Sequence, residues 1–466
     1  MKKIAIIYGT AETPLQQRAV AELSSVILDD TFAYPACFPY DAAADRSAFR
    51  CIYIGTKGNN PYIRAHSAAV LTREEGYAIT VENDTVIIEG YDDAGVLYGV
   101  CDFYHKYIVR FAHPDNDRYW VNVWERECLP DFFHTSYPAV RERGLWTWGH
   151  VIYDYKGYLD HMVKLKMNRV IIWNDFVPVN ARELVAYAHS CGIKVIWGFP
   201  WLWGTRCDKV DLRALDGKSE EIFDFYESQY ANACGDGIYF QTFTELNTDR
   251  IDGVLIAEAA ADFVNRTAAL FYARYPELEI QFGLHATSVK NRLEFIARVD
   301  PRIRIVWEDC GAFPFDYIPT KVDNFEETMA FTQRIAVLRG ATDRFGAVTK
   351  GLVKLDWRNF SHSEGSHTIG VSSRAMKENR VARKHRIWKY IQAYWLVNAD
   401  YVLRAVREMS RLKEGDLLLA ALVEDGMFEE QVMFPVALYA EMLWDCRTDV
   451  RTMIPEVAMR SYVVFA

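Results

Sequence analysis

The feature that most constrains the fold of this 466-residue chain is a regular alternation of strand-like and helix-like segments that begins at Arg141. Short apolar runs alternate with longer stretches of helical apolar spacing, which is typical of parallel strands joined by crossover helices. The predicted strands are Gly144–Trp148, Arg169–Trp173, Lys194–Phe199, Gly237–Phe243, Glu279–Leu284, Arg302–Trp307 and Gly351–Trp357. Seven such units predict an α/β fold with a (β/α)8 TIM-like barrel whose eighth strand is unassigned. A doubly wound open sheet is the alternative.

The segments between these strands have the apolar spacing and the stop signals of helices. Gly192 follows one of them, and Pro276 and Pro301 follow two others. The predicted helices are Tyr155–Lys166, Ala181–Ser190, Ser219–Ala233, Ala257–Tyr275, Val289–Val299 and Phe325–Leu338.

Residues 1–140 predict a small α/β domain that precedes the barrel. A hairpin is expected at Asn83-Asp84, and an irregular linker around Pro130 and Pro138 leads out of the domain. The strands expected here are Ile4–Tyr8, Cys51–Ile54, Gly76–Val81 and Thr85–Glu89, and the helices are Ala19–Leu28 and Asp92–Tyr107.

The remaining chain divides at about Ala375. Residues 141–375 are expected to form the barrel, and residues 376–466 a helical region packed on it. The periodic segment Lys384–Met409 predicts one long helix, and Leu417–Asp445 predicts two more.

Charge and composition limit the partners that this chain can have. The net charge of −10, with no basic stripe to oppose it, argues against nucleic acid and anionic membranes. No stretch approaches the ~20 apolar residues of a membrane span. The nine cysteines form no CxxC pair and are expected to be reduced, so a cytoplasmic location is predicted. A homodimer is the expected assembly if the chain associates at all.

Carboxylates stand at the ends of three predicted strands, where a barrel places its catalytic groups. Glu245 ends the fourth strand, the pair Glu308-Asp309 ends the sixth, and Asp356 ends the seventh. Glycoside hydrolysis requires two carboxyl groups across the scissile bond, separated by ~5–5.5 Å for retention or ~6.5–9.5 Å for inversion. We therefore predict Glu245 as general acid with Asp309 or Asp356 as base. Only one of Glu308 and Asp309 can face the barrel axis.

Aromatic and polar side chains at other strand ends predict a sugar-binding surface. The chain has 13 tryptophans, and flat sugar faces stack on such rings, although an ordinary core uses them too. The candidate substrate-binding residues are Trp146, Trp148, Asn174, Asp175, Trp201, His285, Trp307, Trp357 and Arg358. No cofactor is predicted, because nucleotide-binding and zinc motifs are missing. His362, Glu364 and His367 form only a weak metal candidate.

Three short motifs carry a resemblance to known enzymes. They are Glu75-Gly-Tyr-Ala-Ile, Val86-Ile-Ile-Glu-Gly and Gly95-Val-Leu-Tyr-Gly-Val. This stretch resembles the end of the small domain that precedes the barrel in family 20 hexosaminidases and family 67 α-glucuronidases. The resemblance implies a glycoside hydrolase with a Glu acid after the fourth strand, which Glu245 matches. The hexosaminidases carry Asp-Glu at this point, whereas this chain has Thr244-Glu245, so the residue that orients an acetamido group is missing.

The sequence therefore predicts an exo-acting glycoside hydrolase for a uronic-acid-containing or related oligosaccharide. Two alternatives remain open at this point. One is a catalytically silent carbohydrate-binding barrel, and the other is an enzyme similar to β-N-acetylhexosaminidases. The silent form would hold Glu245 without a second carboxylate nearby.

Overall fold

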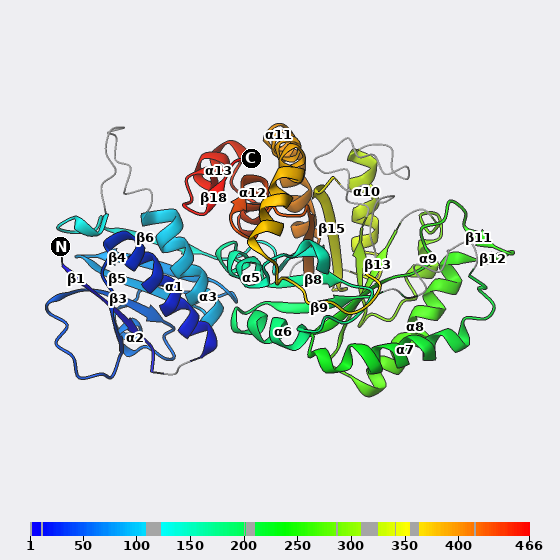
Figure 1. The fold of residues 1–466 in the computed structure, drawn as a ribbon, viewed down its shortest axis with the longest axis horizontal. Coiled ribbons are helices and arrows are strands. Elements are labelled where there is room, and N and C mark those ends of the chain that lie inside the picture. Colours follow the sequence, from blue (N-terminus) through cyan, green and yellow to red (C-terminus); the bar gives the residue numbers. More distant parts are fainter. Residues whose placement is uncertain are drawn as a thin grey trace.

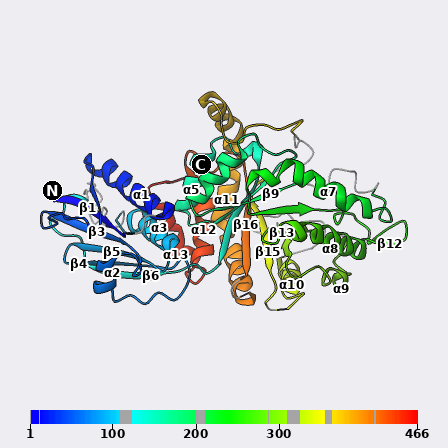
Figure 2. The same ribbon diagram turned by 90° about the horizontal axis from the view of Figure 1, so that it is seen from below.

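The computed structural model describes residues 2–10, 13–108, 123–199, 201, 210–285, 288–308, 325–340, 342–354, 363–413 and 416–466. Figure 1 shows a small α/β domain at one end of the molecule and a larger barrel beside it. The same two parts are seen from below in Figure 2. No helix within the described ranges is long and apolar enough to cross a membrane.

The N-terminal domain is a six-stranded sheet with the strand order β2-β1-β3-β5-β4-β6. Strands β2, β1, β3 and β5 are parallel, and β4 runs antiparallel to both of its neighbours. The hairpin between β4 and β5 is confirmed, because Asn83 and Asp84 both adopt the positive φ that its tight turn requires. The strands are β1 (Lys3–Tyr8), β2 (Ala36–Pro39), β3 (Phe49–Gly55), β4 (Tyr77–Glu82), β5 (Thr85–Gly90) and β6 (Phe132–Ser136).

Strand β6 corrects the prediction of an irregular linker between Pro130 and Pro138. Its residues pair with β4 from Phe132 to Ser136, so the segment completes the sheet before the chain enters the barrel. The alternation of half-buried and exposed residues along β6 marks an edge strand. The helices of this domain are α1 (Pro14–Thr31), α2 (Pro61–His66) and α3 (Asp93–Asp102), which continues into a π-helical turn, η1 (Phe103–Ile108).

The second part is a closed barrel of eight parallel strands, which confirms the predicted (β/α)8 class. In order around the barrel its strands are β7 (Glu142–Trp148), β8 (Arg169–Trp173), β9 (Lys194–Gly198), β10 (Gly237–Gln241), β13 (Glu279–Leu284), β14 (Arg304–Trp307), β15 (Phe345–Leu352) and β16 (Leu417–Val423).

Two strands of the barrel differ from the prediction. The eighth strand, β16, lies in the segment Leu417–Asp445, which was expected to be helical. All seven of its residues are apolar or small and are buried, and a short run of this kind has no periodicity that separates a strand from a helix. Strand β15 begins and ends earlier than predicted, so Gly351–Trp357 is only partly a strand. The barrel therefore runs past residue 375.

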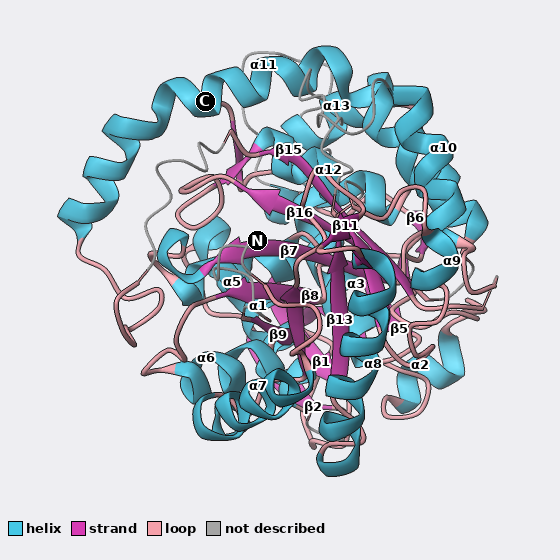
Figure 3. Ribbon diagram, turned by 90° about the vertical axis from the view of Figure 1, so that its right-hand side faces the viewer, coloured by secondary structure: helices cyan, strands magenta, loops and turns pink. Residues whose placement is uncertain are grey.

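Helices surround the barrel, and the long α11 lies outside it along the upper edge of the view in Figure 3. Helix α11 precedes β16 and α12 follows it, so both belong to the barrel's own repeat rather than to a separate layer. The helices are α5 (Tyr155–Lys164), α6 (Ala181–Ser190), α7 (Asp216–Gln229), α8 (Ile256–Arg274), α9 (Leu293–Ile296), α10 (Phe325–Ala336), α11 (Arg374–Leu412), α12 (Phe434–Trp444) and α13 (Val450–Ala458).

Short elements complete the described chain. They are the 3-10 turns η2 (Val123–Glu125), η3 (Gly149–Val151) and η5 (Ala231–Ala233), and the strand pairs β11 (Arg250–Ile251) with β12 (Val254–Leu255) and β17 (Val432–Met433) with β18 (Val463–Val464).

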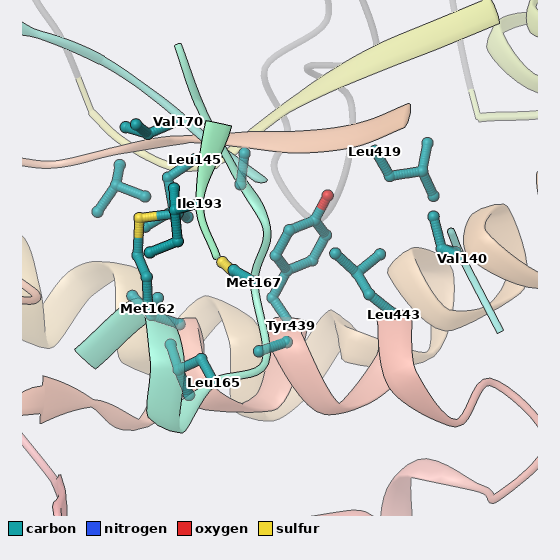
Figure 4. Close-up of a cluster of buried hydrophobic side chains, with 14 of the residues drawn as sticks. Val140, Leu145, Met162, Leu165, Met167, Val170, Ile193, Leu419, Tyr439 and Leu443 are labelled. Carbon is teal, nitrogen blue, oxygen red and sulfur yellow. The ribbon is translucent and has the colours of Figure 1, made fainter. Parts of the chain in front are cut away.

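The main core lies between the outer faces of the barrel strands and the helices. Figure 4 shows part of it, where Leu145 of β7 and Leu419 of β16 meet Tyr439 and Leu443 of α12. Residues that alternate with these on the same strands point into the barrel and form a second cluster, which includes Trp146. Side-chain direction on each strand thus separates the packing face from the face that leads to the barrel mouth.

Candidate active site

Two carboxylates and one imidazole meet at the carboxyl ends of neighbouring barrel strands. The Nε2 atom of His285, which follows β13, lies 3.1 Å from Oε1 of Glu245 and 3.3 Å from Oε2 of Glu308. These two carboxylate oxygens are therefore at most 6.4 Å apart, the sum of the two distances. That limit falls near the separation that glycoside hydrolysis requires.

The two carboxylates differ in exposure. The side chain of Glu245 is 36% exposed, whereas that of Glu308 is 3% exposed. Glu245 follows β10 on the loop that begins at Thr242, and its side chain is partly exposed there. Glu308 directly follows β14 and is buried. A substrate that enters the mouth therefore reaches Glu245 first.

Polar side chains from two strands hold the Glu308 carboxylate in place. Tyr239 and Gln241 of β10 both donate hydrogen bonds to its Oε1 atom. Lys350 of β15 places its ammonium group 3.7 Å from Oε2. A buried carboxylate is costly to ionise unless charge and hydrogen bonds compensate for lost water, and these contacts supply both.

The strand register explains why Glu308 faces the site. Ile305 and Trp307 belong to the core outside the barrel, whereas Val306 belongs to the cluster inside it. Because direction alternates along a strand, Glu308 follows Val306 toward the axis. Asp309, one of the two predicted candidates for the base, lies outside the described residues.

Gly283 of β13 makes the approach of Tyr239 and Glu308 sterically feasible. A β-carbon on Gly283 would collide with the Tyr239 hydroxyl and with Oε1 of Glu308. Gly283 is paired with Gln241 on one side and with Val306 on the other. The missing side chain therefore opens the space in which the carboxylate and its two donors meet.

The eighth strand supplies a further carboxylate that sequence analysis missed. Glu424 directly follows β16, and it accepts hydrogen bonds from the backbone N of Lys354 at 2.9 Å and from Nζ of Lys384 at 2.7 Å. It is buried and fully engaged in these contacts. Because the strand before it was taken for a helix, no strand-end signal pointed to Glu424. Its contacts tie β15 and α11 to the rim of the barrel.

Four aromatic side chains line the inner face of the barrel next to the carboxylates. Trp146, Trp148, Trp173 and Tyr239 form mutual ring contacts, with centroids between 4.9 and 6.4 Å apart. Gly198 leaves the room that the Trp173 ring needs. Trp146 and Trp148 were predicted at this end of the barrel, and their rings form the floor below the mouth. Trp173 also stands at a strand end in the sequence, whereas Tyr239 was not predicted.

Trp201 and Trp307 point the other way and correct two predictions of sugar-binding residues. The Trp201 ring is fully buried and stacks on Phe240 at 3.6 Å, and the Trp307 ring packs against Phe331 of α10 at 5.0 Å. Trp201 follows β9 and packs against Phe263 and Phe271 of α8, whereas Trp307 occupies an outward position on β14. They contribute to packing and not to the inner surface.

Asn174 and Asp175, two further predicted binding residues, directly follow β8. Asn174 is buried, with its side-chain amide against Gly149, and Oδ2 of Asp175 accepts a hydrogen bond from the backbone N of Ser363 at 3.2 Å. These contacts connect the end of β8 to the segment before α11.

Besides Asp309, four predicted residues lie outside the described parts of the chain. They are Asp356, Trp357, Arg358 and His362. Of the weak metal candidate, Glu364 is exposed and His367 is half-buried. Among the described residues, no group of three or more His, Cys, Asp or Glu side chains has the geometry to hold a metal ion.

Comparisons with known proteins identify relatives by structure and none by sequence. No family model matches the sequence, and no curated protein is detectably similar to it. Solved structures with the same architecture include CpGH84B (TM-score 0.57, 11% identity, 98% of this chain and 70% of that one). They also include a GH138 enzyme targeting pectin rhamnogalacturonan II (TM-score 0.56, 12% identity, 97% of this chain and 65% of that one).

Two further similar structures have names that state an activity. One is a β-N-acetylhexosaminidase from Bacteroides fragilis NCTC 9343 (TM-score 0.55, 13% identity, 100% of this chain and 93% of that one). The other is BtGH115A, a 4-O-methyl-α-glucuronidase with specificity for decorated arabinogalactans (TM-score 0.54, 13% identity, 95% of this chain and 56% of that one). The chain spans less than two thirds of the GH138 and GH115 proteins. At these identities the comparisons establish that the chain shares the fold of these proteins.

Proposed function

We propose that this protein is a glycoside hydrolase that uses Glu245 as its general acid. The observation that carries the proposal is the convergence of Glu245 and Glu308 on His285 at the mouth of the barrel. A lone Glu245 would have favoured a silent barrel. The solved structures that share the fold bear names of glycoside hydrolases, which supports the same reaction class.

The environments of the two carboxylates suit different roles in this reaction. Glu245 is half-exposed at the mouth, where it can protonate the leaving oxygen of a bound glycoside. Glu308 receives hydrogen bonds from Tyr239 and Gln241 and lies beside Lys350, so its carboxylate is held in a fixed position. We assign Glu308 the role of the second carboxylate, which attacks the sugar or activates water on the opposite face. The upper limit of 6.4 Å on the separation of these two oxygens admits the retaining separation of ~5–5.5 Å and lies just below the inverting range of ~6.5–9.5 Å.

We further propose that the substrate bears uronic acid and is cleaved from its end. The fold similarity to a 4-O-methyl-α-glucuronidase and to an enzyme targeting pectin supports an acidic polysaccharide. Thr244, which stands before Glu245, offers no carboxylate to an acetamido group, so it counts against the hexosaminidase chemistry.

The test is hydrolysis of aryl glycosides and acidic oligosaccharides by the wild type and by Glu245→Gln. The variant is expected to lose about 10²–10⁴-fold activity on substrates with poor leaving groups, and much less on activated aryl glycosides that need no protonation. Glu308→Gln is expected to lose activity on both kinds of substrate. Glu258→Gln, which alters an exposed carboxylate on α8, is the matched control. Full activity of Glu245→Gln on a poor leaving group would overturn the assignment.

One observation favours a second candidate, a carbohydrate-binding barrel without catalysis. Glu308 is buried and saturated with partners, as a structural carboxylate would be. In that case the wild type would bind oligosaccharides from the panel and release no sugar from any of them. Binding with turnover that depends on Glu308 would exclude this candidate.

A further inference from the structure

The first half of α11 concentrates positive charge that the composition of the whole chain conceals. Seven of the sixteen residues from Arg374 to Lys389 are lysine or arginine and only Glu378 is acidic, although the protein carries a net charge of −10. Sequence analysis expected no basic stripe. The structure separates these cations into two faces of one helix with different surroundings.

The cations on the inner face are neutralised by acidic residues of the barrel. Lys377 lies 3.0 Å from Asp154, Arg380 pairs with Asp425 and Glu429, and Lys384 lies 2.7 Å from Glu424. These pairs fix the helix to the carboxyl-terminal end of the barrel, the end that holds the candidate site.

The cations on another face have no such partners. Arg383 and Arg386 are exposed and form no ion pair with any described residue. They share a face with Tyr390, because positions i, i+3 and i+7 align on a helix. Lys354 lies beside Tyr390 on this face, with its ammonium group 3.6 Å from the centroid of the ring. We name Lys354, Arg383 and Arg386 the basic rim.

The basic rim lies close to the candidate site. Lys354 is four residues beyond Lys350, which contacts Glu308, so the backbone between them spans at most about 14 Å. The backbone N of Lys354 also binds Glu424 at the end of β16. A ligand that occupies the site and extends outward along this edge by a few sugar units would reach the basic rim.

We propose that the basic rim binds the anionic groups of an acidic polysaccharide whose terminal sugar occupies the candidate site. The inference rests on the proposed function for the site itself, and it adds that the substrate is a charged chain rather than a monosaccharide conjugate. Three exposed cations, two on one face of α11 and one over the Tyr390 ring of that face, complement a polymer with repeated carboxylates or sulfates. A neutral polysaccharide would leave these side chains without any role in binding.

The test measures binding separately from catalysis. Glu245→Gln serves as the background so that the ligand is not consumed, and the probe is an oligogalacturonide beside its carboxyl-reduced, neutral form. A sulfated oligosaccharide of similar length distinguishes the two sources of anionic groups. Calorimetry is expected to show about ten-fold tighter binding of an acidic form than of the neutral form at low salt, and a smaller ratio at high salt.

Neutralising the basic rim with Lys354→Gln, Arg383→Gln and Arg386→Gln is expected to abolish this preference and to leave binding of the neutral form unchanged. The control carries Lys3→Gln, Arg411→Gln and Arg451→Gln, which remove equal charge from exposed positions away from the mouth. Equal loss in the control, or no preference in the parent, would overturn the proposal. Tighter binding of a single-stranded DNA oligonucleotide at the same residues would also overturn it. Hydrolysis of an uncharged aryl glycoside, unchanged by the triple substitution, reports on the proposed function independently.

Discussion

Gly283 and Glu308 face each other across adjacent strands so closely that no β-carbon fits between them. Glu308 could not reach Tyr239 and Gln241 if β13 carried any side chain at this position. The arrangement of the candidate site thus depends on a residue that contributes no functional group.

Replacing Gly283 with Ala is expected to displace the Glu308 carboxylate and reduce hydrolysis by about 10²-fold, because a shift of about 1 Å at a reacting group has such an effect. The overpacked interior is expected to cost about 1–3 kcal/mol of unfolding free energy. Gly346→Ala is the control, since its β-carbon would meet Val306 at 3.2 Å, where the neighbouring side chain can adjust. Steady-state kinetics of both variants measure the effect on hydrolysis, and thermal unfolding measures the effect on stability. Equal activities would show that the Glu308 position is not critical.

Glu22 of α1 predicts how the joint between the N-terminal domain and the barrel responds to acid. Burial opposes ionisation, but contacts with His105 and with Lys164 of α5 outweigh it and lower the pKa of Glu22 to about 2. Because the folded-state pKa lies below the ordinary value of 4.5, the ionised form stabilises the protein above that value. This stability, about 3 kcal/mol, is lost as the pH falls from about 4.5 toward 2.

Glu22→Gln is therefore expected to be less stable than the wild type at pH 7, and the difference should shrink steadily below pH 4.5. Denaturant unfolding at a series of pH values measures it. Glu82→Gln, at an exposed position on β4, is expected to change stability by less than about 0.5 kcal/mol at every pH. A wild-type minus Glu22→Gln difference that stays constant with pH would contradict the role of the ionised carboxylate.

A buried ionic cluster joins three segments that are far apart in the sequence. Arg460 pairs with Glu441 of α12, which also contacts Lys106 at 3.0 Å, and Lys166 lies 2.8 Å from Asp102. Arg460→Met is expected to cost about 3–5 kcal/mol of unfolding free energy, because it leaves Glu441 buried with less compensation. Arg451→Met on the exposed face of α13 is expected to cost less than about 0.5 kcal/mol. Similar melting temperatures for the two variants would show that the cluster is not a stabilising unit.

Much of the architecture could be predicted because alternating strands and helices carry a clear periodic signal. The helix Ala181–Ser190 and the hairpin at Asn83-Asp84 are confirmed to the residue. Strand β16 could not be predicted, since a fully buried parallel strand lacks the alternation that exposes one face. Once it was missed, the barrel boundary and Glu424 were missed with it.

The candidate site was predictable in position but not in every residue. The rule that strand ends carry function led to Glu245 and His285, which do meet in the structure. The sequence could not choose between Glu308 and Asp309, because that choice depends on which residues of the preceding strand point into the barrel. Alternation along Arg304–Trp307 gives the answer only once one inward-facing residue is known. The outward direction of the Trp307 side chain follows from the same alternation. It can be predicted from the sequence once Val306 is known to point into the barrel.

The late position of β16 has a consequence for the newly made chain. Until residues 417–423 leave the ribosome, β7 and β15 have no shared partner, and each exposes an unpaired strand edge. Seven strands and the 39 residues of α11 must therefore remain in an incomplete cylinder, a state prone to pairing with other chains. Strand β16 pairs with both β7 and β15 and so closes the barrel. The barrel is therefore expected to close in a single late step, after β16 has been synthesised, and not by adding one repeat at a time.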